Sequence, residues 1–160
     1  MRLYVGALKK HKSCHIYLKF RIVVSEFSKK ARPRKILIVD NEPDIALTIK
    51  VGLDREGILS DAFTDPREAL KQFRHHTEDY LLVLTDVRMP FMSGFELAKR
   101  IRETKPEANI ILMTSFEIDS LEFVKVFPST KVDGVLQKPF LMSALTNLIV
   151  SYADQSKNKV

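Results

Sequence analysis

Five polar residues lie at the ends of apolar runs in this chain, and their side chains suit one kind of chemistry. Asp40 and Asn41 follow KILIV, Asp86 ends YLLVLTD, Thr114 follows NIILM, and Lys138 ends GVLQK. Two carboxylates about 4 Å apart repel by roughly 4 kcal/mol at an effective dielectric constant near 20, and a divalent cation relieves that repulsion. Oxygen ligands without His or Cys favour Mg²⁺. With the Lys138 ammonium and the Thr114 hydroxyl added, the set predicts a phosphoryl site with a carboxylate nucleophile.

Regularly alternating elements are expected to position these residues. The apolar runs are typical of buried strands, and the segments between them show helical spacing of apolar residues with Pro or Asp near their starts and Gly57 after the first helix. Strands are expected at 35–40, 58–63, 80–86, 109–115 and 134–138, and helices at 42–57, from 66, through Arg102, around Leu121 and Val124, and from 141 to Tyr152. Five strands alternating with five helices predict an α/β fold, with a parallel sheet covered on both faces.

That fold explains why a strand such as 80–86 ends on a carboxylate. In an open parallel sheet, ligands bind beyond the carboxyl ends of the strands, where the winding direction changes. All five polar residues are predicted at that edge. Pro90 and Gly94, which follow Asp86, are expected to form the turn that exposes it.

The charge divides the chain into two parts. Residues 1–35 contain eleven Lys or Arg and one acid, Glu26, whereas residues 36–160 contain fifteen Lys or Arg and nineteen acids. We expect a basic N-terminal extension at 1–33, either disordered or a short strand around Phe20, then one domain at 34–153 and a tail at 154–160. The apolar runs are far shorter than the roughly 20 residues of a membrane helix. The single cysteine, Cys14, cannot form an internal disulfide, so we expect a reducing cytoplasm and no membrane insertion.

Four motifs in order resemble the receiver domain of two-component response regulators. They are ILIVDNEPDI, LLVLTDVRMPFMSGFEL, IILMTSF and VLQKPF, and the resemblance covers about residues 34–153. It implies a flavodoxin-like doubly wound sheet of order 2-1-3-4-5. It also implies a domain that is not an enzyme in its own right but assists its own phosphorylation and dephosphorylation. No output domain is expected after Tyr152, so signalling would occur through contacts with an unknown protein target.

The resemblance also assigns roles to the site residues. Asp86 would accept a phosphoryl group from a phosphohistidine on a histidine kinase or phosphotransfer protein, while Thr114 and Lys138 would bind the phosphate. Mg²⁺ would be held by Asp40, Asn41, Asp86 and the backbone carbonyl of Arg88. The Lys138–Pro139 peptide bond would be cis.

The sequence departs from the family pattern at two positions. A second acid is usual where this chain has Asn41, and a neutral amide oxygen predicts weaker metal binding. A Tyr or Phe that changes rotamer is usual three residues before the lysine, where this chain has Val135. The stiff, β-branched Val135 cannot make that movement.

Three other functions remain as alternatives. A pseudo-receiver would keep the fold and act as an interaction module with little phosphorylation, which Asn41 and Val135 favour. A dehalogenase-type phosphatase also uses an aspartyl nucleophile, but it requires a second Asp two residues after the first, where this chain has Glu42. Nucleic-acid binding by the basic extension would depend on phosphate contacts, and no base-reading motif supports it, so a nucleic-acid partner is not expected.

Overall fold

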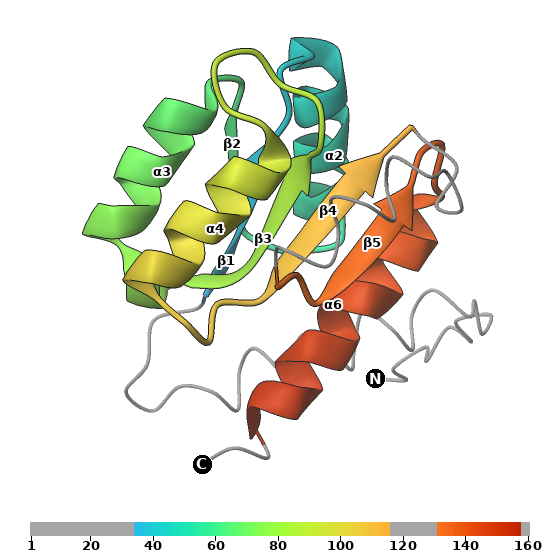
Figure 1. Ribbon diagram of the computed structural model, residues 1–160. Helices are drawn as coiled ribbons and strands as arrows, with labels where there is room; N and C mark the ends of the chain where they lie inside the picture. The colour runs from blue at the N-terminus through green and yellow to red at the C-terminus, as the bar shows by residue number, and fades with distance from the viewer. Residues whose placement is uncertain (1–33, 116–130, 158–160) are drawn as a thin grey trace, which may run out of the picture.

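A five-stranded parallel sheet forms the centre of the molecule in the computed structural model, which describes residues 34–115 and 131–157 (Figure 1). The strands are β1 (Lys35–Val39), β2 (Ser60–Phe63), β3 (Tyr80–Asp86), β4 (Ile110–Thr114) and β5 (Gly134–Gln137). Their order is β2-β1-β3-β4-β5, and every neighbouring pair is parallel. The predicted α/β fold with strand order 2-1-3-4-5 is therefore confirmed.

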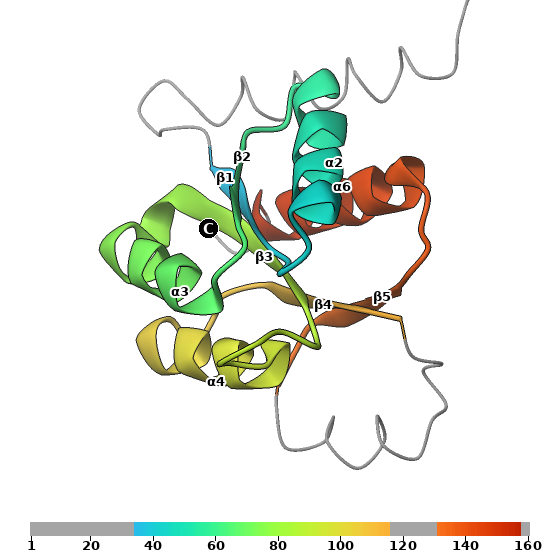
Figure 2. The same ribbon diagram turned by 90° about the horizontal axis from the view of Figure 1, so that it is seen from above.

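Helices cover both faces of the sheet (Figure 2). The helices of the described residues are α2 (Pro43–Arg55), α3 (Pro66–His75), α4 (Gly94–Thr104) and α6 (Met142–Lys157), with a 3₁₀ turn, η1, at Thr77–Asp79. One face packs against α3 and α4, and the other packs against α2 and α6. The predicted helix around Leu121 and Val124 and the basic extension at 1–33 lie outside the described residues.

The strands are apolar at successive positions because both faces of the sheet are buried. In β1, Leu37 and Val39 pack on the side of α3 and α4, whereas Ile36 and Ile38 pack on the side of α2 and α6. All four side chains are fully buried. A nearly unbroken apolar run in the central strands is therefore what this architecture requires, whereas the edge strands β2 and β5 are only partly buried.

The helix ends agree with local sequence signals. Pro43 lies at the start of α2, and Gly57 has a φ of 75° after its last turn. The Gly57 and Ile58 amides donate to the carbonyls of Asp54 and Leu53, which is the hydrogen-bond pattern of a Schellman cap. The hydroxyl of Ser93 accepts from the Glu96 amide at the start of α4.

Several predicted boundaries differ from the structure, most of them by one or two residues. The second strand begins at Ser60 and not at 58, because Ile58 belongs to the α2 cap while its side chain is still buried. Lys138 lies one residue beyond β5. The last helix continues to Lys157, past the expected end at Tyr152, because no Gly or Pro interrupts residues 153–157.

Among the described helices, none combines the length and the apolar character needed to cross a bilayer.

The carboxylate of Asp65 caps α3 and should give the protein an acid-sensitive contribution to stability. Hydrogen bonds from the Arg67 side chain and amide lower the pKa of Asp65 from 3.8 to about 2. Because the folded pKa lies below the unfolded one, the contribution is complete above about pH 4 and is lost as the pH falls toward 2. Asp65→Asn keeps a capping oxygen but removes the charge. We expect the difference in unfolding free energy between the two chains to shrink over that interval, and a difference that is constant with pH would contradict the assignment.

Gly94 should tolerate no side chain, because a Cβ at this position would overlap the backbone carbonyl of Asp86. Gly94→Ala is expected to lower the free energy of unfolding by about 1–3 kcal/mol, the usual cost of overpacking. Gly52→Ala is the matched control, because its Cβ would meet only the flexible end of Met142, with the Cε atom 2.6 Å away. That change also removes a glycine from the interior of α2, which favours the helix. Urea denaturation of both variants measures the contrast, and equal stability would show that the loop adjusts freely.

Candidate functional site

The Lys138 ammonium bridges two buried carboxylates at the carboxyl edge of the sheet. Its Nζ atom is 2.7 Å from Asp40 Oδ2 and 2.7 Å from Asp86 Oδ1. The Asp40 side chain is 0% exposed, and those of Asp86 and Lys138 are 11% and 12% exposed. Burial alone would lower the pKa of Lys138, but its hydrogen bonds to the two carboxylates outweigh that effect and raise the pKa above its usual value. Lys138 is therefore a permanent cation, and Asp86 is the carboxylate that solvent reaches.

Backbone amides hold the other oxygen of each carboxylate. The Glu42 amide donates to Asp40 Oδ1 at 3.0 Å, and the Arg88 amide donates to Asp86 Oδ2 at 2.7 Å. Each donor lies two residues after the carboxylate that it binds, in the loop that follows the strand. Both side chains are thereby oriented at the strand end by a tight local turn, as is common for aspartate.

Backbone hydrogen bonds continue just past the strand ends and fix the positions of the site residues. The Asp40 amide donates to the carbonyl of Phe63 at 3.1 Å, and the Lys138 amide donates to the carbonyl of Thr114 at 2.7 Å. The Val87 amide donates to the carbonyl of Met113 at 3.0 Å. The charged cluster therefore lies on a rigid part of the sheet edge, which favours precise placement of reacting groups.

A small cavity opens beside Asp86. It has a volume of about 180 Å³, which is room for a small oxyanion and a few waters at about 30 Å³ per water. Thr114 lines it and is 1% exposed. The complete lining is Asp86, Val87, Arg88, Thr114 and Ser115.

The structure brings the predicted site residues to one edge. Asp40, Asp86 and Lys138 are in direct contact, and Thr114 shares the cavity with Asp86. Asn41 is half-buried in the β1–α2 connection, directly after Asp40. The Lys138–Pro139 peptide bond is cis, as the family resemblance implied.

Val135 also lies where the sequence predicted it. It is half-buried in β5 and pairs with Leu112 of the neighbouring strand β4. The site thus has no aromatic ring at this position of β5.

The donor set suits a hard divalent cation with few protein ligands. Among the described residues, no group of three or more His, Cys, Asp or Glu side chains could hold a metal ion. Asp40 and Asp86 supply two carboxylates, and the Asn41 amide and the Arg88 carbonyl are neutral oxygens nearby in sequence. Mg²⁺ commonly takes one or two carboxylates and keeps several waters, so this set fits it better than zinc.

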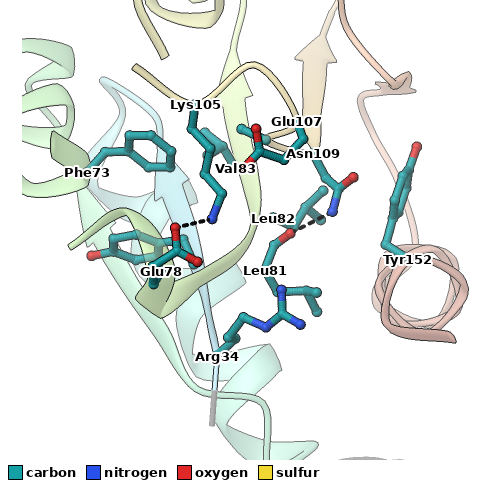
Figure 3. A pocket seen from close by; sticks show the side chains of 12 residues that line it. Arg34, Phe73, Glu78, Leu81, Leu82, Val83, Lys105, Glu107, Asn109 and Tyr152 are labelled. Atoms are coloured by element: carbon teal, nitrogen blue, oxygen red, sulfur yellow. Dashed lines mark hydrogen bonds and ion pairs between the residues drawn. The ribbon is translucent and has the colours of Figure 1, made fainter. Parts of the chain in front are cut away.

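A second cavity lies at the opposite edge of the sheet (Figure 3). It has a volume of about 230 Å³ and includes two cations, Arg34 and Lys105, and two acids, Glu78 and Glu107. The Lys105 ammonium is 2.9 Å from the Glu78 carboxylate. None of the predicted site residues lines this cavity, and the charges of its two cations and two acids balance.

Sequence reasoning did not identify the two amides that orient the carboxylates. No residue type marks them, because any residue except proline has an amide. The sequence pattern also does not distinguish Phe91 from Met92, which are adjacent and both apolar, whereas the structure separates them: Met92 is 9% exposed and Phe91 is 81% exposed. The left-handed backbone of Phe91, with a φ of 67°, produces that difference.

Comparisons with known proteins agree with the geometry. The chain is 30% identical to the response regulator receiver protein CpdR of Brucella abortus over 116 residues, 72% of this chain and 93% of that protein. It is 30% identical to the DNA-binding transcriptional regulator NtrC of Proteus hauseri over 127 residues, 76% of this chain and 26% of that protein. For five of its curated relatives, including NtrC, the chain spans only 5% to 43% of their length.

A solved structure shows the same fold. The CheY-like receiver domain protein of Methanospirillum hungatei superposes with a TM-score of 0.71 at 26% identity, covering 79% of this chain and 98% of that one. The family of the response regulator receiver domain matches residues 36–150. The strand order and the four polar residues at the strand ends agree with this match. The chain belongs to the response regulator receiver domain family.

Proposed function

We propose that this receiver domain accepts a phosphoryl group on Asp86 from a phosphohistidine of a histidine kinase or phosphotransfer protein. The observation that carries the proposal is the contrast between two bridged carboxylates. Asp40 is fully enclosed, whereas Asp86 borders a cavity and remains partly exposed. The phosphorylated domain would then act through contacts with another protein, in the cytoplasm.

The transfer is a simple exchange of bonds. A carboxylate oxygen of Asp86 attacks phosphorus, the bond from phosphorus to the imidazole nitrogen breaks, and the neutral imidazole leaves after taking up a proton. The carboxylate thereby becomes an acyl phosphate, and its charge changes from about −1 to about −2 at neutral pH. Lys138 would offset part of that charge, and the hydroxyl of Thr114, which lines the cavity beside Asp86, would donate to a phosphoryl oxygen.

A divalent cation would be held by Asp40, Asp86, the Asn41 side-chain oxygen and the Arg88 carbonyl. When bound, Mg²⁺ would neutralise charge on the transferred phosphoryl oxygens. The protein's own contribution is to hold the Asp86 carboxylate in one orientation, through the Arg88 amide and Lys138, before the donor arrives.

A pseudo-receiver remains the second candidate, and it rests on Asn41 and Val135. Asn41 is neutral, so the metal site has one negative charge fewer than the family pattern. Val135 lacks an aromatic ring that could change rotamer. The contacts of Asp40, Asp86 and Lys138 argue for a working phosphoacceptor, because an interaction module has no need for two buried carboxylates.

Removing the proposed nucleophile should separate the two candidates. Asp86→Asn is expected to abolish phosphorylation by phosphoramidate in the presence of Mg²⁺, measured by intact-protein mass spectrometry. Asp44→Asn is the matched control, because Asp44 is an exposed acid in the first turn of α2. It should be phosphorylated like the unaltered chain. Phosphate retained on Asp86→Asn at the normal level would contradict the proposal. An unaltered chain that accepts no phosphate would favour the pseudo-receiver.

Restoring a second acid should strengthen the metal site. Asn41→Asp is expected to tighten Mg²⁺ binding by about tenfold, equivalent to about 1.4 kcal/mol. Isothermal titration calorimetry measures the affinity. Gln137→Glu is the matched control, because it adds the same charge on an exposed side chain next to Lys138. An equal gain in both variants would mean that position 41 acts through its charge and is not a ligand, and an unchanged affinity in Asn41→Asp would mean that repulsion cancels the gain.

A further inference from the structure

The loop between β3 and α4 holds an aromatic side chain in an unusual position. The Gly94 amide donates to the Val87 carbonyl at 3.0 Å and closes the loop. Within it, Val87 and Met92 are buried and Met89 is partly buried against the core. Phe91, between these anchors, is 81% exposed. The loop therefore buries its other large apolar side chains and leaves one aromatic ring outside.

The backbone at Phe91 is strained. Its φ is 67°, a region that bulky residues rarely adopt, and the Met92 amide donates to the Pro90 carbonyl at 2.8 Å. Together these define a γ-turn with a left-handed central residue, which is an uncommon and strained turn. A glycine would adopt it without steric cost. The chain thus has a large residue where a small one would be more stable, and such strain often marks a functional position.

A neighbouring cation fixes the ring of Phe91. The Arg67 guanidinium carbon lies 4.2 Å from the ring centroid, within the range of a cation–π contact. Asp65 fixes Arg67 in turn, with distances of 3.0 Å from Nε to Oδ1 and 2.6 Å from NH2 to Oδ2. An exposed but fixed aromatic ring loses little conformational freedom when a partner covers it.

A second exposed apolar side chain lies at the same edge of the sheet. Leu141 is 75% exposed, and its carbonyl accepts from the Ala144 amide at the start of α6. Among the large apolar side chains in the described residues, Phe91 and Leu141 are the two most exposed. Phe91 lies between β3 and α4 and Leu141 lies between β5 and α6, so both follow the carboxyl end of a strand. Figure 1 shows these two connections at the same end of the sheet.

We infer that Phe91, supported by Leu141, is an anchor for the protein that presents phosphohistidine to Asp86. This inference rests on the proposed function. A protein donor must cover the carboxyl edge in order to bring its imidazole to the cavity beside Asp86, and the loops that hold Phe91 and Leu141 lie at that edge. Aromatic residues are enriched at the centres of protein interfaces, where a few anchors contribute most of the binding energy. The matching surface is an apolar recess beside the phosphohistidine.

Two phosphoryl donors test the anchor. Phosphoramidate is a small molecule that can reach Asp86 without contacting Phe91. Histidine-phosphorylated kinases and phosphotransfer proteins of the source organism must instead dock on the carboxyl edge, where Phe91 lies. Phe91→Ala should accept phosphate from phosphoramidate within twofold of the unaltered rate but lose at least tenfold in transfer from the protein donor. Leu141→Ala should lose about threefold with the protein donor alone. Leu59→Ala is the matched control, because Leu59 is 47% exposed just before β2, at the opposite edge, and both rates should be unchanged.

Two further variants separate the effect of the Phe91 ring from the effect of its strained backbone. Phe91→Tyr keeps an aromatic ring and should retain transfer from the protein donor. Phe91→Gly removes both ring and strain, so it should lose transfer as Phe91→Ala does while unfolding at a higher temperature than Phe91→Ala.

The possible failures are distinguishable. Normal transfer from the protein donor to Phe91→Ala overturns the inference, and so does an equal loss with both donors, which would show that Phe91 only shapes the loop. An unaltered chain that accepts phosphate from phosphoramidate but from none of the histidine-phosphorylated proteins overturns the assigned partner. Failure with phosphoramidate as well overturns the proposed function itself.

Discussion

Two carboxylates held out of water make the Lys138 charge a requirement of this site. Removing one partner of a buried ion pair typically costs about 3–5 kcal/mol, because the remaining charge is left uncompensated. Asp40 is fully buried, so the Lys138 ammonium and the Glu42 amide are its visible compensation. The single positive charge leaves the three-residue cluster with a net charge of −1, and phosphorylation of Asp86 would make it more negative. One further cation would offset this negative charge, so in the proposed function phosphorylation and metal binding would be linked.

The strand order explains why the bridging cation is a lysine. Lys138 follows β5, and β4 separates that strand from β3, which carries Asp86. Two strand spacings amount to about 10 Å, and Asp40 on β1 is one spacing farther away. A long side chain is needed to cover that distance, and it must cross the end of β4, where Thr114 lies. Thr114 therefore lies between the strands that carry Asp86 and Lys138, and it shares the cavity with Asp86 because of the strand order.

The features that burial dictates could be predicted from the sequence. The limits of β3 agree with the predicted 80–86, because that run is apolar apart from the fully buried Thr85 and the final residue, Asp86. The charged residues at the strand ends were also identified, because a carboxylate after a buried run is chemically conspicuous. Apolar pattern reports burial and not strand geometry, however, and Ile58 shows the difference: it is buried but forms part of the α2 cap. The end of α6 was missed for the converse reason, since polar residues can extend a helix beyond its apolar stripe.

Backbone conformation determines which loop side chains are exposed, and the sequence pattern does not predict this. Phe91 and Met92 are adjacent and both apolar, and one left-handed residue turns the first outward while the second stays in the core. No periodicity predicts that turn, which lies in a loop where Gly94 packs tightly against the Asp86 carbonyl and where the Phe91 ring contacts Arg67 of α3. The buried chemistry of the site is thus set by residue types at strand ends, whereas the surface around it is set by loop conformation. Receiver domains with the same charged residues can therefore present different loop surfaces around the site. Differences in these loops would change which partner binds without changing the charged residues.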